Sequence, residues 1–368
     1  MTASAPKDKL IASLTLLSVP GVGRGRFWRL VRHFHSVEAV LRATISELEQ
    51  VPDIGRKVAS AIVAESDPSK AARTAEEIID LGWQVMLADT PEYPTALREI
   101  PDPPPVLYGL GQPLSEDDKL LAIVGTRHAS EIGRRFTGNL ARKLAADGIV
   151  VVSGMADGID TAAHAGALEG GGKTIAVWGT SLDIVYPPTN KDLAERIKAQ
   201  GTVLSEYPPG TGPDKSTFPD RNRIISGLSE GVIVVEAGRK SGALITAEHA
   251  LQQGRELFAV PGPPGVERSI GTNDLLKKGA RIVTTVEDIY EELPRLKGQI
   301  SAQRFRAVEN LTEAEQKMIR LLAEGPKQID QLARDLSLPV SDLLEYMLAL
   351  EMKGMVQELA GKRFVLAE

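Results

Sequence analysis

Short apolar runs alternate with helical patterns through the middle of the chain. Each run spans four to six residues, and segments with helical spacing separate most of them. Continuous apolar strands that alternate with helices are typical of a parallel sheet covered on both faces. We therefore predict an α/β domain with a mostly parallel sheet, whose strands are Leu120–Val124, Ile149–Ser153, Thr174–Trp178, Thr202–Ser205, Gly231–Glu236, Glu256–Val260 and Ala280–Thr284.

Residues 1–67 show a different pattern, in which a helix, a tight turn and a second helix occur twice. The turns are Pro20–Gly23 and Pro52–Gly55. This arrangement predicts a helical domain of the tandem helix-hairpin-helix (SAM-like) type, in which free N–H groups at a helix start hold a DNA phosphate. Asp53 would repel a phosphate, so a small bundle with glycine caps that binds protein or nothing stays open. The candidate secondary DNA contacts are Gly21, Gly23, Arg24 and Arg26.

The sheet domain is predicted to span residues 68–292, and residues 68–118 form a connector with edge elements. Residues 83–87 are predicted to form an edge strand. The segments PEYP and PDPPPVLYG then require an extended path, because proline cannot continue a helix or a central strand. We expect this connector to dock on the sheet.

The C-terminal pattern predicts a linker at 293–310 and a winged-helix-like domain at 311–368. Thr312 and Glu315 form the signature of a capping box, and three helices and a hairpin follow. The third helix, 341–353, carries three acidic residues and one lysine, which opposes entry into a duplex groove. We therefore expect a protein contact or an accessory structural role.

Composition narrows the function classes. A net charge of −6 argues against a protein that coats nucleic acid with its whole surface, but leaves room for a local basic groove. The absence of cysteine excludes disulfides, thiolate metal sites and cysteine nucleophiles. No signal-peptide core and no apolar run of membrane-spanning length is present, so we expect a cytoplasmic protein with no membrane partner.

The segment Ser216–Ala250 contains the strongest chemical signal. Arg221 and Arg223 fall near the predicted start of a helix, where the helix dipole repels cations. This placement suggests that they bind an anion such as a phosphate, with Phe218 as a stacking surface. The alternative is that both point into solvent or pair with a neighbouring carboxylate.

Ligands of parallel sheets bind at the carboxyl ends of the strands, where this chain has small residues and glycines. The first turn, GTRHASEIG, is not a dinucleotide fingerprint, and ALEGGGKT lies between a helix and a strand, the wrong context for a P-loop. No cofactor, metal site or catalytic set is predicted. Asp157, Asp160 and His164 fit a structural role, whereas Glu206 and Glu236 remain candidates for hydrolytic chemistry.

Several motifs resemble the bacterial DNA-processing protein A family (DprA, also called Smf). They are AIVGTRHAS, VVSGMADGIDTAAHAGAL, FPDRNRIISGLS and VVEAGRKSGALITAEHAL, and the likeness runs from about Leu81 to Asp288. The resemblance implies a Rossmann-like core that binds single-stranded DNA and is not known as an enzyme. It also implies partners: the recombinase RecA, loaded onto incoming strands during natural transformation, and a second copy bound through the Rossmann-like domain.

The resemblance also implies DNA-binding residues. Arginine and lysine would hold the backbone and an aromatic ring would accept a base, so binding would tolerate sequence and depend on salt. Rossmann-like folds host many activities, so a nucleotide-type phosphohydrolase remains the alternative, and an interaction scaffold without DNA binding is a third. The implied residues are Arg127, Ser153, Gly154, Lys215, Phe218, Arg221, Asn222, Arg223 and Gly242.

Overall fold

A nine-stranded sheet forms the centre of the computed structural model, with the strand order β1-β2-β6-β5-β4-β3-β7-β8-β9. The structure describes residues 4–296, 312–322, 325–336, 338–352, 355–359 and 361–366. The strands from β3 onward pair in parallel, which confirms the predicted α/β class. They are β3 (Lys119–Val124), β4 (Ile149–Ser153), β5 (Thr174–Val177), β6 (Thr202–Ser205), β7 (Gly231–Val234), β8 (Glu256–Ala259) and β9 (Arg281–Ile282).

The strand order reverses at β3. From there the chain builds outward through β4, β5 and β6, and then returns to place β7, β8 and β9 on the other side. The loops after β3 and β7 therefore leave the sheet on either side of one crevice, which is where open α/β sheets bind ligands.

Two antiparallel strands extend the sheet on the β6 side. The predicted edge strand is confirmed as β1 (Gln84–Leu87), and β1 pairs with β2 (Val106–Gly111), which in turn pairs with β6. The extended path expected for the proline-rich segment leads into β2, a strand inside the sheet that the sequence pattern did not predict. Its last proline is Pro105, so every residue of β2 keeps the N–H group that a ladder requires.

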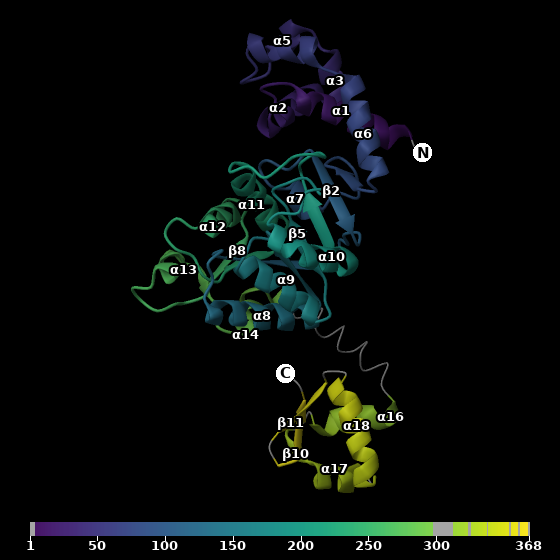
Figure 1. Cartoon of the computed structure of the whole chain (residues 1–368), viewed down its shortest axis with the longest axis vertical. Coiled ribbons are helices and arrows are strands. Elements are labelled where there is room, and N and C mark those ends of the chain that lie inside the picture. Colours follow the sequence, from purple (N-terminus) through teal and green to yellow (C-terminus); the bar gives the residue numbers. More distant parts are fainter. Residues whose placement is uncertain are drawn as a thin grey trace. The chain divides into compact units, whose positions relative to one another are not determined.

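Helices cover both faces of the sheet (Figure 1). On one face, α7, α11 and α12 pack on the apolar side chains of β3, β4 and β7. On the other, α9 and α10 pack on β5 and β6, and α8 packs on α9. Their bounds, with three further helices (η1, α13 and α14), are α7 (Thr95–Arg98), α8 (Glu131–Ala146), α9 (Ile159–Glu169), η1 (Pro188–Asn190), α10 (Lys191–Gln200), α11 (Thr217–Leu228), α12 (Gly242–Gln252), α13 (Glu267–Lys277) and α14 (Val286–Glu292).

The N-terminal helices form a separate small core around Leu16, Phe27, Leu30 and Ile62. The glycine turns lie where the pattern predicted them, and α2 and α5 begin directly after Gly23 and Gly55. The helices are α1 (Ser4–Ser18), α2 (Arg24–Phe34), α3 (Val37–Arg42), α4 (Ile45–Leu48), α5 (Arg56–Glu65) and α6 (Pro68–Asp80).

The chain divides into two compact units, Met1–Leu296 and Lys297–Glu368. The second has the predicted winged-helix pattern, and the capping box is present because Thr312 N–H donates to Glu315 Oε2 and Glu315 N–H donates to Thr312 Oγ1. Most of the predicted linker 293–310 lies outside the described residues, and the predicted domain boundaries stay predictions. The elements are α16 (Glu313–Leu322), β10 (Lys327–Gln328), α17 (Ile329–Leu336), α18 (Val340–Met352), β11 (Val356–Leu359) and β12 (Arg363–Leu366).

Across the described residues, no helix combines the length and the apolar character needed to cross a membrane.

Candidate functional site

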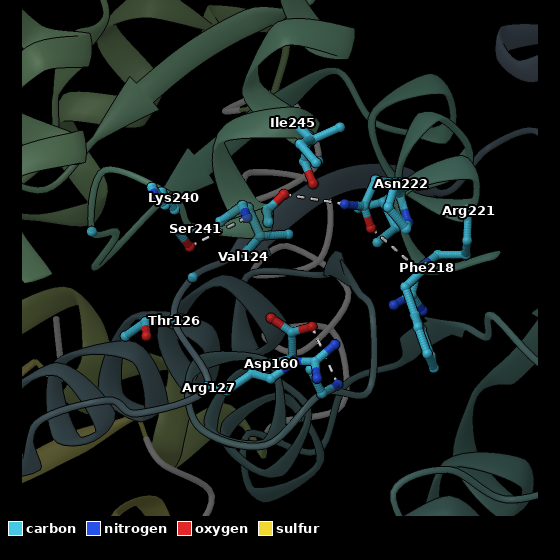
Figure 2. A pocket seen from close by; sticks show the side chains of 18 of the residues that line it. Val124, Thr126, Arg127, Asp160, Phe218, Arg221, Asn222, Lys240, Ser241 and Ile245 are labelled. Carbon is cyan, nitrogen blue, oxygen red and sulfur yellow. Dashed lines mark hydrogen bonds between the residues drawn. The ribbon is translucent and has the colours of Figure 1, made fainter. Parts of the chain in front are cut away.

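A pocket of about 690 Å³ lies at the crevice where the strand order reverses (Figure 2). The loop after β3 and the loop that leads from β7 to α12 form two of its walls, and the start of α11 forms a third. The predicted site residues Arg127, Lys215, Phe218, Arg221 and Asn222 all line it, together with Gly242.

Three exposed cations surround this pocket. Arg127 follows β3, Lys215 precedes α11, and Lys240 follows β7, so three separate segments of the chain supply them. The lining also contains the carboxylates of Asp160, which is buried, and Glu267. The surface of the pocket is therefore more cationic than a protein of net charge −6 would suggest.

Arg221 lies below these surface cations. Its side chain is only 5% exposed, and Nη1 donates to the carbonyl of Gly154 at 2.6 Å. Burial lowers the pKa of Arg221 to about 10, while the charge of Asp160 acts against that shift. Burial also disfavours the charged form of Asp160 and raises its pKa to about 6, although Arg221 and the backbone N–H of Ala156 favour its ionised form. Arg221 thus contributes positive charge from the floor of the pocket.

Gly154 and Ser153 belong to this floor rather than to an exposed mouth. A Cβ at Gly154 would lie 2.7 Å from Nη2 of Arg221, so the glycine makes room for the guanidinium. Ser153 is fully buried, and its Oγ donates to the carbonyl of Ile123 at 2.6 Å. The resemblance implies that Ser153 and Gly154 bind DNA, but in this structure both are buried and support the pocket from below.

Phe218 is enclosed on several sides. A Cβ at Gly179 would lie 2.7 Å from its Cδ1, the guanidinium of Arg127 is 5.6 Å from its ring centroid, and the ring of Tyr186 is 5.3 Å away with an interplanar angle of 36°. Tyr186 itself is 37% exposed. Of the two rings, Tyr186 has the more accessible surface.

Helix α11 begins at Thr217, so Arg221 and Arg223 lie beyond its first turn. Its pocket side carries Phe218, Arg221 and Asn222, and Nδ2 of Asn222 donates to the carbonyl of Gly242 on α12 at 3.2 Å. Its other side carries Arg223, which points away from the pocket. One helix therefore serves two different environments.

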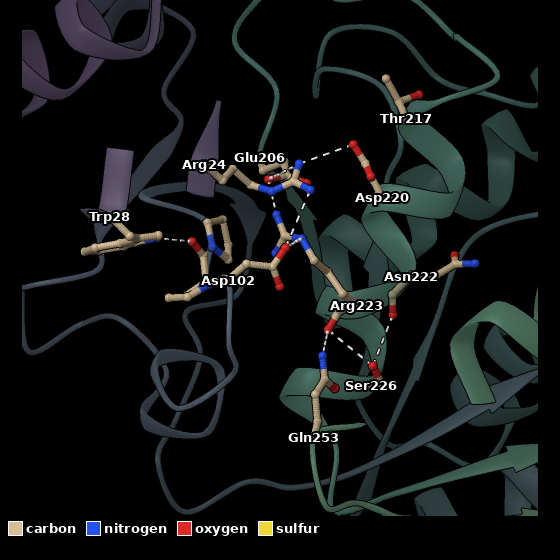
Figure 3. Close-up of polar contacts among 12 residues, drawn as sticks. Arg24, Trp28, Asp102, Glu206, Thr217, Asp220, Asn222, Arg223, Ser226 and Gln253 are labelled. Carbon is tan, nitrogen blue, oxygen red and sulfur yellow. Dashed lines mark hydrogen bonds and ion pairs between the residues drawn. The ribbon is translucent and has the colours of Figure 1, made fainter. Parts of the chain in front are cut away.

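Arg223 is 1% exposed and pairs with the buried carboxylate of Glu206 (Figure 3). Its Nε also lies 3.4 Å from Oδ2 of Asp102. Burial raises the pKa of Glu206, and the charges of Arg223 and Arg24 oppose that shift. The expectation that Arg223 contacts DNA does not fit this position; the alternative, a pairing with a neighbouring carboxylate, describes it.

Arg24 brings the helical domain into the same cluster. Its guanidinium lies 3.7 Å from Glu206, 3.3 Å from Asp220 and 3.7 Å from Asp102. Close by, Trp28 Nε1 donates to the carbonyl of Pro103 at 2.7 Å. The first hairpin is thereby fastened to α11 and to the segment before β2.

Arg26 and Arg29 of the first hairpin are also engaged within the protein. Arg26 donates to the carbonyl of Gly21 at 2.8 Å and to that of Asp53 at 3.1 Å, and Arg29 pairs with the carboxylate of Asp53. These bonds hold the two hairpins together. Gly23 stands before α2 without a side-chain cap, and a Cβ there would meet no atom within 4 Å. The role of Gly21, Gly23, Arg24 and Arg26 in DNA contact stays a prediction.

The candidates for hydrolytic chemistry have structural partners. Glu206 belongs to the arginine cluster, and Glu236 accepts bonds from Ser130 N–H at 2.9 Å and from Ser130 Oγ at 2.6 Å, at the start of α8. Asp157 accepts a bond from Thr189 Oγ1 at 2.9 Å. Within the described residues, no group of three or more His, Asp or Glu side chains is placed to hold a metal ion.

His164 is fully buried, and its Nδ1 lies 2.7 Å from Thr174 Oγ1, whose own proton goes to the carbonyl of Val151. Nδ1 therefore carries the hydrogen, and Nε2 lacks a partner. Burial lowers the pKa of His164 to about 3. We expect the ring to stay neutral from pH 7 to pH 4 in the folded protein, as measured by imidazole nitrogen shifts in NMR spectra.

The buried, neutral ring of His164 makes the stability of the folded protein fall as the pH falls. The unfolded ring binds a proton near pH 6.5, so its contribution to stability is complete above that pH and is lost as the pH falls toward 3. Asp160 has the opposite effect on stability. Because its pKa is raised in the folded protein, its contribution to stability increases as the pH falls from about 6 to 3.8. Titration of His164 above pH 5 in the folded state would contradict this assignment.

Two pocket residues, Lys240 and Tyr186, are missing from the site that the sequence predicts. Lys240 was visible as a cation within the glycine-rich turn after a strand. Tyr186 has no sequence signal of its own, because the loop between β5 and α10 brings it beside Phe218 only in the fold.

Comparisons with known proteins agree with the fold. The family model described as DNA recombination-mediator protein A matches residues 84–294, the DprA winged helix domain matches 302–362, and the SAM-like helix-hairpin-helix tandem matches 13–66. Protein Smf of Synechocystis is 35% identical over 94% of this chain and 96% of its own length. DNA processing protein DprA of Bacillus subtilis is 42% identical over 61% of this chain and 76% of its own.

Two solved structures are also similar. DNA processing protein A of Streptococcus pneumoniae matches with a TM-score of 0.68 and 34% identity, covering 77% of this chain and 97% of its own. DNA processing protein A of Helicobacter pylori, whose structure is described as giving insights into its single-stranded DNA binding mode, has a TM-score of 0.53 and 34% identity and covers 58% and 96%.

Proposed function

Since this chain belongs to the DNA recombination-mediator protein A (DprA/Smf) family, we propose that it binds single-stranded DNA in the pocket at the strand-order reversal and acts as a recombination mediator. The observation that carries the proposal is the convergence of Arg127, Lys215 and Lys240 from three loops. Separate exposed cations around one opening suit successive phosphates of a polymer.

The contacts differ in kind. Arg127, Lys215 and Lys240 are exposed and hold phosphates, whereas the buried Arg221 adds its field from below. At the start of α12, Ala243 N–H already donates to Ser241 Oγ, which leaves the N–H of Gly242 as a further donor, and a Cβ at Gly242 would meet no atom within 4 Å. None of these groups recognises a particular base, so binding should be independent of sequence.

Tyr186 supplies the ring that stacks on a base in this proposal. Its exposed surface is free, whereas Phe218 is enclosed by Gly179, Arg127 and Tyr186. Phe218 then positions Tyr186 and Arg127.

Replacing Tyr186 with alanine should weaken oligo-dT binding by about 1–3 kcal/mol, and replacing it with phenylalanine should retain most of the affinity. Fluorescence anisotropy with labelled oligo-dT measures both. An abasic strand of the same length is the control, since it should bind Tyr186→Ala and the unaltered protein alike. Equal affinity of Tyr186→Ala and the unaltered protein for oligo-dT would remove Tyr186 from the contact.

We further propose that the protein is non-enzymatic, forms a homodimer through the sheet domain, and protects incoming strands while loading RecA during natural transformation. The engagement of Glu206 and Glu236 in structural contacts leaves the phosphohydrolase alternative without its two candidate carboxylates. The test combines an oligo-dT gel shift with a nucleotide-hydrolysis screen and a RecA-loading assay. Hydrolysis without single-strand binding would overturn the proposal.

A further inference from the structure

Helix α18 of the C-terminal unit presents an apolar stripe to solvent. Val340, Leu344 and Leu348 follow each other at four-residue spacing and are 39%, 38% and 59% exposed. Residues at this spacing lie on one face of a helix. The stripe is therefore continuous along most of α18.

The fold of the unit does not use this stripe. Its core is built from the neighbouring side of α18, where Leu343, Met347 and Leu350 are buried against α16, α17 and the strands. Single exposed apolar residues are ordinary, but aligned ones mark a contact surface.

The helix that carries the stripe is acidic, although its Asp342 lies on the opposite side of the helix from Val340, Leu344 and Leu348. The segment Val340–Met352 contains Asp342, Glu345 and Glu351 and no lysine or arginine. Asp342 accepts a bond from Ser341 Oγ at 3.0 Å. Glu351 comes three turns after Val340 and so falls in line with the stripe. These carboxylates repel a phosphate backbone and favour cations.

We propose that the exposed face of α18 is a docking surface for a basic amphipathic helix of another protein. Such a helix places apolar residues every three or four positions against the stripe and sets lysine or arginine beside the carboxylates. A second α18 would bring two sets of carboxylates together. The basic helix α2 of a second copy does not fit either, because its Phe27 and Leu30 are buried in its own core.

The test uses the full chain and a designed probe, a fluorescent helical peptide of leucine and lysine in heptad spacing. A scrambled peptide of the same composition controls for attraction to the acidic protein as a whole. We expect the helical peptide to bind at least tenfold more tightly than the scrambled one, and the double variant Leu344→Ser/Leu348→Ser to lose that preference. Glu345→Lys/Glu351→Lys should weaken binding in a salt-dependent way.

The proposal would be overturned by equal binding of both peptides, by an undiminished preference in Leu344→Ser/Leu348→Ser, or by a shift from dimer to monomer in that variant, measured by sedimentation. Binding of duplex DNA that depends on Leu344 and Leu348 would also overturn it. The substituted side chains are exposed, and circular dichroism checks that each variant keeps its fold.

Discussion

Replacing Glu206 with alanine is expected to destabilise the N-terminal unit by about 3–5 kcal/mol, because it removes the buried carboxylate that pairs with Arg223 and leaves only Asp102, which is 42% exposed, beside that buried cation. Arg223 is 1% exposed, and the side chain of Glu206 is 7% exposed, so water cannot replace the lost carboxylate. Arg24 loses a nearby charge in the same variant. Urea denaturation of the full chain, followed by tryptophan fluorescence, measures the change.

The double variant Glu206→Met/Arg223→Met is the matched control. Removal of both charges leaves no uncompensated ion, and apolar replacements of buried pairs are often close to neutral. We therefore expect the double variant to be more stable than Glu206→Ala. A loss of less than about 1 kcal/mol in the free energy of unfolding for Glu206→Ala would show that water reaches Arg223 and compensates its charge.

The second large effect concerns the surface cations, and it rests on the proposed function. Each phosphate contact changes the slope of log K against log salt by about 0.7 for a single strand, which corresponds to roughly fivefold in affinity at 0.1 M salt. Alanine replacement of Arg127, Lys215 and Lys240 together should therefore weaken oligo-dT binding roughly a hundredfold at that salt concentration. The slope should flatten by about 2.

Arg142 provides the matched control for this experiment. It is exposed on α8 and pairs with Glu169 at 2.7 Å, and it does not line the pocket. Arg142→Ala should leave both affinity and slope unchanged. If the triple variant kept its slope, these three residues would not contact phosphates, whatever its overall affinity.

Much of the fold follows from periodicity. The apolar runs of the sheet are long enough to show their character, and the hairpin glycines and the capping box of Thr312 are local signals. β2 could not be recognised in the same way, because its position inside the sheet depends on pairing with β6, which is distant in sequence. Proline beside a strand is a local feature, whereas strand pairing is a tertiary one.

The site was predictable in part. The motif around Phe218 and the residues Arg127, Lys215 and Asn222 lie together at one pocket, while their contact with DNA stays a prediction. Because α11 begins at Thr217, Arg221 and Arg223 lie beyond its first turn, where the helix dipole no longer disfavours a cation. The anion nearest to Arg223 is Glu206 of the protein itself, and burial of that kind leaves no trace in a sequence.

Helix α11 places the side chains of Phe218–Arg223 in two different surroundings, so these residues are under two different structural constraints. Phe218, Arg221 and Asn222 face the pocket, whereas Asp220 and Arg223 face the cluster with Arg24. A saturation screen should thus give lost ligand affinity at Phe218, Arg221 and Asn222, and lost protein abundance in the cell at Asp220 and Arg223. The short motif would therefore combine a ligand-binding function and a folding function, and a single fitness score would not distinguish a variant that has lost affinity from one that has lost abundance.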